Sequence, residues 1–436
     1  MKKLFITGLV FSFLAFTSCG SDDNGNGVIG GSDDDGDGEV STTLEGQITE
    51  DLTLTSDVIW TLDGRVTVTS GATLTIEPGT IIKAEGGTGA NASVLIIAQD
   101  AAINAAGTAS APIIFTSIAD DIAIGETAGT NLDQNQRGLW GGLIVLGNAP
   151  VSLDGNAETA QIEGIPASDT NGLYGGTNAA DNSGTLTYIS IRHGGALIGE
   201  GNEINGLTLG GVGTGTTISH IEVVGNVDDG VEFFGGTVNA SNLFVWAQGD
   251  DAIDIDQAYA GTIDNVIVVQ GNISDHALEI DGPEGEAAGS FVLQNVTLIG
   301  SASGEVADYR SGATGTTSNV LVYGFEESAD VELDNNGVAQ NYIDGELSFE
   351  NWEVILWTGV VSGADIFVEK GGCIENCDND SSADDVLQDL IIETTTGTTF
   401  TAQAEGWTTA VTTGTVGATT SDFSWTYSNT KAGLGF

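Results

Sequence analysis

Basic residues are scarce in this sequence. It has 9 Lys and Arg residues against 62 Asp and Glu residues, which gives a formal net charge of −53 at pH 7. A surface with so few cations cannot neutralise phosphates, so nucleic-acid binding through a basic face is excluded. Proline is scarce as well: 5 residues beside 64 glycines exclude collagen and proline-rich disorder. The 40% hydrophobic content suffices for a sizeable core, and the many Thr, Val, Ile and Gly residues predict a β-rich fold.

The only apolar run near the N-terminus is too short to cross a bilayer. Lys2 and Lys3 precede the run from Leu4 to Phe16, which is the pattern of an export signal over residues 1–18. Small residues then lead to Cys19. This arrangement resembles a bacterial lipobox, which implies cleavage before Cys19 and acylation of its thiol and amine. An ordinary cleaved signal with a stray cysteine is the alternative.

Residues 19–43 form a polar segment rich in Gly, Asp, Asn and Ser, which predicts a flexible acidic tether. Its first residues, Ser-Asp-Asp from Ser21, resemble the surface-export signals of Bacteroidota lipoproteins. That resemblance implies exposure on the outer face of the outer membrane. The two remaining cysteines, Cys373 and Cys377, predict a disulfide, because an even pair outside the inner membrane usually forms one.

Two strand patterns alternate through the middle of the chain at intervals of roughly 22–30 residues. The interval is too short for a βαβ unit with its helix, and no segment there has a sustained helical period. We therefore predict an all-β fold, a right-handed parallel β-helix over residues 44–346. A looser insertion over 119–184 leaves this coil, and a Trp-rich C-terminal segment, 347–436, is predicted to cap it.

One of the two patterns begins each time with an asparagine. These residues are Asn242, Asn265, Asn295 and Asn319. Asparagine tolerates the left-handed backbone conformation and bonds to nearby backbone groups, so each one is expected at a bend into the next strand. In stacked coils the amides would then form a hydrogen-bonded ladder.

The second pattern alternates strictly, and alternation assigns faces. Ile253 and Ile255 point inward, so Asp254 points outward, and the same parity stacks one outward column of acids: Glu232, Asp254, Glu279, Asp308 and Glu332. A neighbouring column contains Phe234, Asp256, Asp281, Arg310 and Asp334. At a rung spacing of ~4.8 Å, like charges repel by ~3–4 kcal/mol at an effective dielectric of 20. Such a column must hold cations, raise some pKa values or splay into water.

Further acids enter the same face at the preceding turns, as Asp228-Asp229 and Asp250-Asp251. Carboxylates from turns and strands suit Ca²⁺, which prefers hard oxygen ligands. The candidate Ca²⁺ ligands are Asp228, Asp229, Asp250, Asp251, Asp254, Asp256, Glu279 and Asp281. The alternative for the turn acids is capping of backbone amides.

The outward positions of the first pattern are apolar. Leu243 and Val245 point inward, so Phe244 and Trp246 point outward. A patch this apolar is expected to be covered, either by the Trp-rich tail or by another protein.

The order Asp228-Asp229-Gly230, Gly249-Asp250-Asp251, His276 and Arg310 resembles polygalacturonase-type motifs on a pectate-lyase-like coil. There, paired carboxylates act as acid and base on a glycosidic bond. The catalytic candidates are therefore Asp229, Asp251, His276 and Arg310. The Gly-His-Gly and Arg-x-Lys elements of those enzymes are absent, so no catalytic residue is assigned.

A wider set of motifs resembles one family of lipoproteins. It comprises the lipobox, Thr-Leu-Thr-Ile-Glu-Pro-Gly-Thr from Thr73, the glycine-flanked run from Gly138 to Gly147, Arg192-His193-Gly194-Gly195 and the run from Asp228 to Gly236. The combination looks like Bacteroidota outer-membrane lipoproteins and is similar to a leptospiral outer-membrane lipoprotein family. The resemblance implies a lipid anchor in the outer membrane and an association with TonB-dependent receptors.

The sequence thus predicts a surface-exposed, lipid-anchored β-helix that serves as a binding or structural module, with Ca²⁺ on its acidic face. A binding role is favoured over an enzymatic one. Two alternatives remain open: a hydrolase or lyase acting on a polyuronate-like extracellular polysaccharide, and an accessory lipoprotein of a TonB-dependent outer-membrane receptor.

Overall fold

The computed structural model describes residues 41–197, 204–371, 373–375, 386–387 and 389–434. The predicted signal peptide, Cys19, nearly all of the tether, and Cys377 of the predicted disulfide lie outside these residues. Within the described part of the chain, no helix has the length and apolar character needed to cross a membrane.

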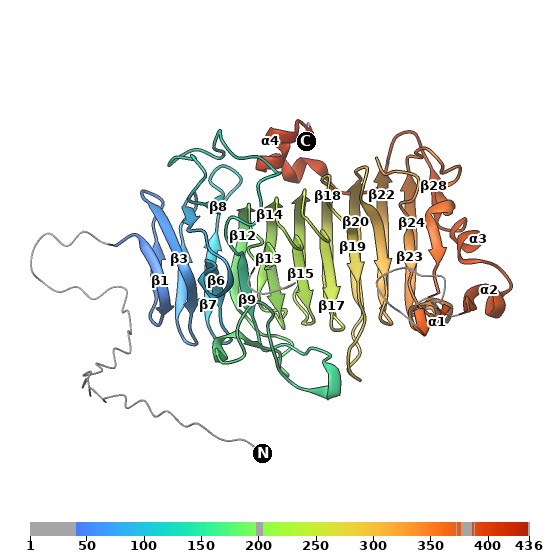
Figure 1. Cartoon of the computed structure of the whole chain (residues 1–436), viewed down its shortest axis with the longest axis horizontal. Coiled ribbons are helices and arrows are strands. Elements are labelled where there is room, and N and C mark those ends of the chain that lie inside the picture. Colours follow the sequence, from blue (N-terminus) through green and yellow to red (C-terminus); the bar gives the residue numbers. More distant parts are fainter. Residues whose placement is uncertain (1–40, 198–203, 372, 376–385, 388, 435–436) are drawn as a thin grey trace, which may run out of the picture.

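The chain winds into a solenoid of parallel strands (Figure 1). The first coils contain β1 (Thr43–Ile48), β2 (Leu52–Leu54), β3 (Ile59–Val68), β4 (Thr73–Ile76), β5 (Ile81–Ala84), β6 (Val94–Ile97), β7 (Ala102–Ala106), β8 (Ile113–Ser117) and β9 (Leu143–Leu146). From β12 onward a longer and a shorter strand alternate, and each pairs in parallel with the strand two places further along the chain. This topology confirms the predicted parallel β-helix.

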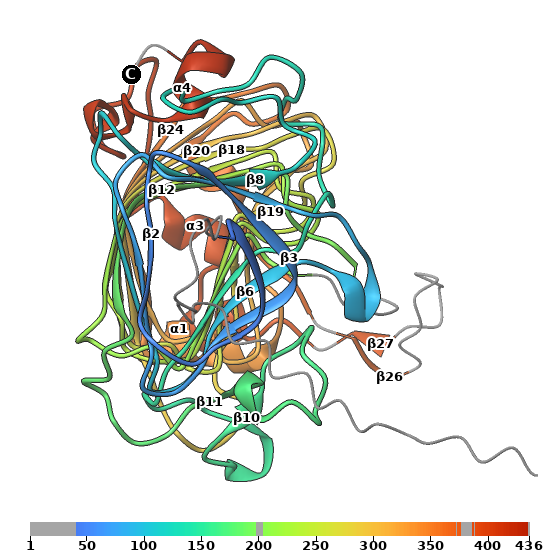
Figure 2. The same ribbon diagram turned by 90° about the vertical axis from the view of Figure 1, so that its left-hand side faces the viewer.

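The longer strands form one sheet of the coil: β12 (Gly184–Arg192), β14 (Thr217–Val224), β16 (Ala240–Trp246), β18 (Thr262–Val269), β20 (Phe291–Ile299), β22 (Gly315–Tyr323) and β24 (Leu347–Val354). The shorter strands form the sheet of the acidic face: β13 (Leu207–Gly210), β15 (Val231–Phe234), β17 (Ile253–Asp256), β19 (His276–Ile280), β21 (Glu305–Tyr309), β23 (Val331–Leu333) and β25 (Phe367–Glu369). Viewed along the long axis, the coils lie over one another (Figure 2).

A single apolar core fills the coil, and strand parity supplies it as predicted. Ile253 and Ile255 on β17 and Leu243 and Val245 on β16 point inward and are at most 1% exposed. Their neighbours on each strand point outward. The alternation therefore fixes which side chains reach the outer faces.

The asparagine corner also forms as predicted. Asn242, Asn265, Asn295 and Asn319 have φ values of 57°, 65°, 58° and 55°, in the left-handed region. The Nδ2 of Asn265 donates to Asn242 Oδ1 at 2.5 Å, and that of Asn319 donates to Asn295 Oδ1 at 3.2 Å. The ladder is interrupted in the middle, because Asn295 Nδ2 donates to Asp264 Oδ1 instead, at 2.6 Å.

The insertion over 119–184 is only partly a loop. It contains the coil strand β9, and its remainder forms a small hairpin of β10 (Ala160–Gln161) and β11 (Leu173–Tyr174). It is held to the coil by hydrogen bonds with the loop after β19, where Glu284 N donates to Ser152 O at 3.3 Å and Gly285 N donates to Ser152 Oγ at 3.2 Å. The insertion thereby forms a wall at one edge of the acidic sheet.

The coil continues beyond residue 346, the end expected from the sequence. Strands β24, β25 and β28 (Thr408–Ala410) still pair in parallel with the preceding coil. Helices α1 (Asn336–Asp344), α2 (Ile391–Thr396) and α3 (Phe400–Ala404) lie at this end (Figure 1). Aromatic rings close the core there, and they belong to Tyr342, Phe349, Trp352, Phe367, Phe400 and Trp407.

Residues 411–434, which we call the C-terminal strap, run back along the outside of the long-strand sheet. Successive strap residues bond to β24, β20, β18 and β14, through Glu353, Thr297, Asn265 and Glu222. Phe423 and Tyr427, the latter in α4 (Tyr427–Ala432), pack over the outward rings of β16. The tail of the chain itself therefore covers the apolar flank, which is one of the two predicted arrangements.

Candidate functional site

The register of the short strands places the predicted acids in one column. Glu232 is paired with Asp254, Asp254 with Glu279, Glu279 with Asp308, and Asp308 with Glu332. In the second column Phe234 is paired with Asp256, and Asp281 follows on the next coil. The stacking that was expected from the repeat is therefore confirmed.

These acids lie at the floor of a groove rather than on an open face. The groove has a volume of about 560 Å³, and Glu232, Asp254, Asp256, Glu279 and Asp281 form much of its floor. Its walls come from Glu163 of the insertion and from residues 282–284 of the loop after β19. As a result Glu232 and Asp254 are only 6% and 8% exposed, although they point away from the core.

Two of the acids that line the groove, Glu232 and Asp254, gather with a third carboxylate from a neighbouring turn. Asp229, from the turn before β15, Glu232 and Asp254 each place one oxygen within 4.8 Å of the others. Asn205 Nδ2 donates to Glu232 Oε2. Asp254 Oδ1 is buried and has no hydrogen-bond partner among the described residues. We call Asp229, Glu232 and Asp254 the carboxylate cluster.

Without a bound cation, the ionised carboxylates of the cluster repel one another. Burial, followed by the charge of Asp254, raises the pKa of both Asp229 and Glu232 well above its usual range. Burial, followed by the charges of Asp256 and Asp251, does the same to the pKa of Asp254. Such carboxyls either keep protons at neutral pH or require a cation beside them.

Basic side chains neutralise the other end of the column of acids. Arg310 pairs with Glu279, and its Nε lies 2.7 Å from Asp281 Oδ2. Its Nη1 lies 3.8 Å from Asp308 Oδ2. Arg310 follows Asp281 in the second column as predicted, but no ion pair with Asp334 occurs among the described residues.

Lys370, one residue beyond β25, extends this pattern. It pairs with Glu332, and its Nζ lies 3.5 Å from Asp330 Oδ1. Within the described part of the chain, no salt bridge reaches Asp229, Glu232 or Asp254. Protein cations therefore neutralise the column of acids from Glu279 onward, but they do not neutralise Glu232 and Asp254, which precede it.

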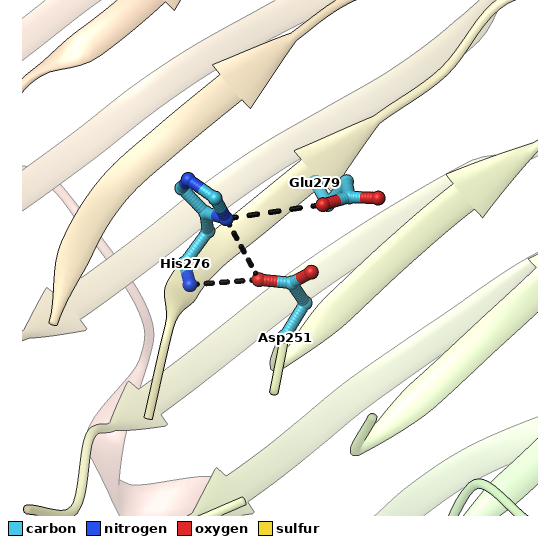
Figure 3. Close-up of side chains that lie close together, drawn as sticks. All are labelled: Asp251, His276 and Glu279. Carbon is cyan, nitrogen blue, oxygen red and sulfur yellow. Dashed lines mark hydrogen bonds and ion pairs between the residues drawn. The ribbon is translucent and has the colours of Figure 1, made fainter. Parts of the chain in front are cut away.

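A histidine–aspartate pair lies beside the groove (Figure 3). Asp251 Oδ1 accepts hydrogen bonds from the backbone N of His276 at 2.7 Å and from its Nδ1 at 3.0 Å. Glu279 lies 3.8 Å from the same Nδ1. Burial opposes the charged imidazole, but the hydrogen bond and charge of Asp251 outweigh it and raise the pKa of His276 to about 8.

The four catalytic candidates are connected through short contacts. Asp229 Oδ1 accepts a hydrogen bond from the backbone N of Asp251 at 2.9 Å, and Asp251 holds His276. Arg310 joins the network through Glu279. The bond from Asp251 N also shows that Asp229 caps a backbone amide, which was the alternative role for the turn acids.

The candidate Ca²⁺ ligands fall into overlapping groups. Asp228, Asp229 and Asp250 form a second set of mutually close oxygens at the turns, and Asp254, Glu279 and Asp281 form a third in the groove. Asp251 belongs with His276 and Glu279. Asp256 lines the groove outside these groups; burial, with the nearby charge of Asp281, raises its pKa to about 7.

Sequence reasoning missed three contributors to the groove. Glu232 was placed in the outward column but left out of the ligand set, although it has the same parity as Asp254. Asn205 and Glu163 were not identified, yet Asn205 Nδ2 lies 3.2 Å from Glu163 Oε1 and so ties the insertion to the cluster. Glu163 lies outside the repeat, so no periodic signal could have found it.

Comparison with known proteins gives the family of this chain. A family model described as a pectate-lyase-like β-helix domain matches residues 46–412. No curated protein and no solved structure matches the chain significantly. The matched span begins in β1 and ends after β28, so it includes every strand of the acidic groove. The chain therefore belongs to the pectate-lyase-like β-helix family.

Proposed function

We propose that the protein is a binding module whose acidic groove holds a divalent cation, with Ca²⁺ as the first choice. The cation would be bound by Asp229, Glu232 and Asp254 and would present open coordination positions to a ligand in the groove. Hydroxyl or carboxylate oxygens of an extracellular polysaccharide suit those positions, because Ca²⁺ takes 6–8 oxygen ligands in flexible geometry. A fold of this family, with an acidic groove, fits a protein that binds or acts on polysaccharide.

The observation that carries this proposal is the buried, unneutralised state of the carboxylate cluster. Asp254 is 8% exposed, and its Oδ1 has no partner within the described residues. A buried charge without a partner is costly, and a nearby cation removes that cost. Carboxylate oxygens are the ligands that Ca²⁺ prefers.

Isothermal titration calorimetry with CaCl₂ tests the cation site. The wild-type protein should bind Ca²⁺. Asp254→Asn should weaken binding at least tenfold, because it removes the negative charge of one of the three proposed ligands. Asp264→Asn is the matched control, since Asp264 lies on β18 in the other sheet and outside the groove. Equal affinity in wild type and Asp254→Asn, or no binding by either, would contradict the proposal.

The polysaccharide part of the proposal has its own test. Acidic and neutral bacterial polysaccharides are passed over the immobilised protein with Ca²⁺ and then with EDTA. Retention that needs both Ca²⁺ and Asp254 supports the ligand class. Retention unaffected by EDTA would show that the ligand is held without the cation.

Catalysis is the second candidate function, and the geometry of the carboxyl groups favours it specifically. The cluster brings three carboxyl groups together, and paired carboxyl groups are the catalytic arrangement of glycosidases. Carboxyls with raised pKa values suit a general acid. The test is release of reducing ends or unsaturated products from polyuronates; turnover that is lost in Asp251→Asn would establish an enzyme.

For location, we propose lipid anchoring through Cys19 at the outer face of the outer membrane. The support is the lipobox-like sequence and the acidic residues that follow it. An accessory role beside a TonB-dependent receptor fits that location. Metabolic labelling with palmitate should mark the wild type and leave Cys19→Ala unlabelled, and protease treatment of intact cells should cleave the protein if it faces outward.

A further inference from the structure

We propose that Arg310 is a built-in counter-ion that fills a second cation position of the groove, so that the groove holds one divalent cation where its carboxylates could hold two. This inference rests on the proposed function, because it assumes that the carboxylate cluster is the position left for a metal ion. It adds a residue that sets the number of ions and their place.

The groove contains two adjacent sets of three carboxylates. One is the carboxylate cluster, and the other comprises Asp254, Glu279 and Asp281; the oxygens of each set lie within 4.8 Å of one another. Both sets share Asp254, and the strand register repeats them on successive coils. Both positions therefore offer three carboxylates, and the carboxylate cluster is the more buried of the two.

Arg310 makes them different. It lies one residue past the end of β21, on the next coil, and its guanidinium reaches back to the second set. Its Nε is 2.7 Å from Asp281 Oδ2, and its Nη2 pairs with Glu279 Oε1. Glu279 and Asp281 are two of the three carboxylates that a Ca²⁺ ion would need at 2.3–2.6 Å in the second set. The guanidinium and a metal ion cannot occupy this position together.

The carboxylate cluster has no equivalent. Within the described residues no ion pair reaches it, and Asp254 Oδ1, more than nine-tenths buried in the groove, has no partner. Among the described residues, no salt bridge therefore compensates the charge of the shared residue Asp254. When the cluster is ionised, a cation from solution can bind there, whereas Arg310 opposes a cation one coil further along.

Lys370 provides a matched comparison. It also neutralises two acids near the end of the column, Glu332 and Asp330. These two acids do not belong to a set of three close carboxylates among the described residues. Removing Lys370 therefore removes one positive charge, as removing Arg310 does, but it does not expose a complete set of three ligands.

The test is the stoichiometry of Ca²⁺ binding, measured by calorimetry in low salt on the full chain. Wild type should bind one ion at the groove, Arg310→Gln should bind two, and Arg310→Lys and Lys370→Gln should each bind one. Asp254→Asn combined with Arg310→Gln should lose both ions, because the two positions share Asp254.

The outcomes separate the two claims. One ion in both wild type and Arg310→Gln, or two in wild type, overturns the inference and leaves the proposed function intact. None in wild type and one in Arg310→Gln overturns the proposed cluster site while keeping the role of Arg310, and none in either overturns both.

A melting experiment covers the case in which Arg310→Gln folds poorly. Ca²⁺ should raise its melting temperature by more than that of wild type, because the ion replaces the missing guanidinium. Failure of Ca²⁺ to do so contradicts the inference.

Discussion

Asp254→Asn should stabilise the metal-free protein. Asp254 is the second acid of the column, with Glu232 on one side and Glu279 on the other. Asparagine has nearly the same shape and removes the charge, and its amide can donate to Glu232. A substitution in a buried site thus improves stability, which is unusual because most core substitutions destabilise.

The size of the effect follows from the spacing of the column. At ~4.8 Å, an ionised neighbour repels by ~3–4 kcal/mol at an effective dielectric of 20. Arg310 already offsets Glu279, so burial and the charges of Asp256 and Asp251 dominate, and the hydrogen bond with Glu232 offsets part of their effect. Protonation of one carboxyl relieves part of it, and we expect a net gain of about 1–3 kcal/mol at pH 8. In a chain of this size that corresponds to roughly 1–4 °C in melting temperature.

The pH dependence has a definite sign. Burial and the neighbouring charges raise the pKa of Asp254 in the folded protein. Below pH ~4 the carboxyl is protonated in both the folded and the unfolded state, so the variant and wild type should be equally stable. As pH rises, the unfolded state ionises first and the wild type loses stability, so the advantage of the variant should grow toward pH 8.

Calorimetric melting in EDTA across pH 4–8 measures this difference. Glu332→Gln is the control, because Glu332 occupies the same column but is paired with Lys370, and its neutralisation should give no gain. A loss of stability in Asp254→Asn at pH 8, or a gain that does not depend on pH, would refute the reasoning.

Three further predictions concern the rest of the molecule. Glu222→Gln should lower the free energy of unfolding by about 2–4 kcal/mol and speed tryptic cleavage after Lys431. The reason is that the fully buried carboxylate of Glu222 accepts three hydrogen bonds from the strap. Unchanged cleavage would contradict this anchoring role. In NMR titrations the imidazole of His276 should titrate near pH 8 and the two other histidines below 6.5. The charged imidazole should stabilise the fold by about 2 kcal/mol, fully below pH 6.5, and this stabilisation should disappear as pH rises through 8. Titration of all three histidines below 6.5 would refute this prediction. Asn319→Ala should lose about 1–3 kcal/mol by denaturant unfolding and Asn319→Gly less, because φ is 55° there; equal losses would show that the backbone conformation does not matter.

Much of the fold could be predicted because a coil repeats one local rule. Alternation in Ile253-Asp254-Ile255, repeated on each coil, determined both the core and the acidic column, and an asparagine at each bend marked the corner. The end of the coil was harder to find. Strand β24 keeps the pattern but follows the helix α1, which interrupts the spacing between repeats.

The environment of the acids could not be read in the same way. Parity predicts that Asp254 points outward, but its burial depends on Glu163 and residues 282–284, which lie outside the repeat. The direction of the Arg310 side chain was also open, since acids lie on either side of it, and it turns to Asp281 and not to Asp334. Both features decide which carboxylates remain without a counter-ion.

The most direct test of the account is a crystal structure grown with Ca²⁺, or with Mn²⁺ as an anomalous scatterer. The account predicts one ion in the groove, with Asp254 Oδ1, Asp229 and Glu232 among its ligands at 2.3–2.6 Å for Ca²⁺, and the guanidinium of Arg310 still on Glu279 and Asp281. An empty cluster in the presence of saturating metal, or an ion seated between Glu279 and Asp281 with Arg310 displaced, would contradict it.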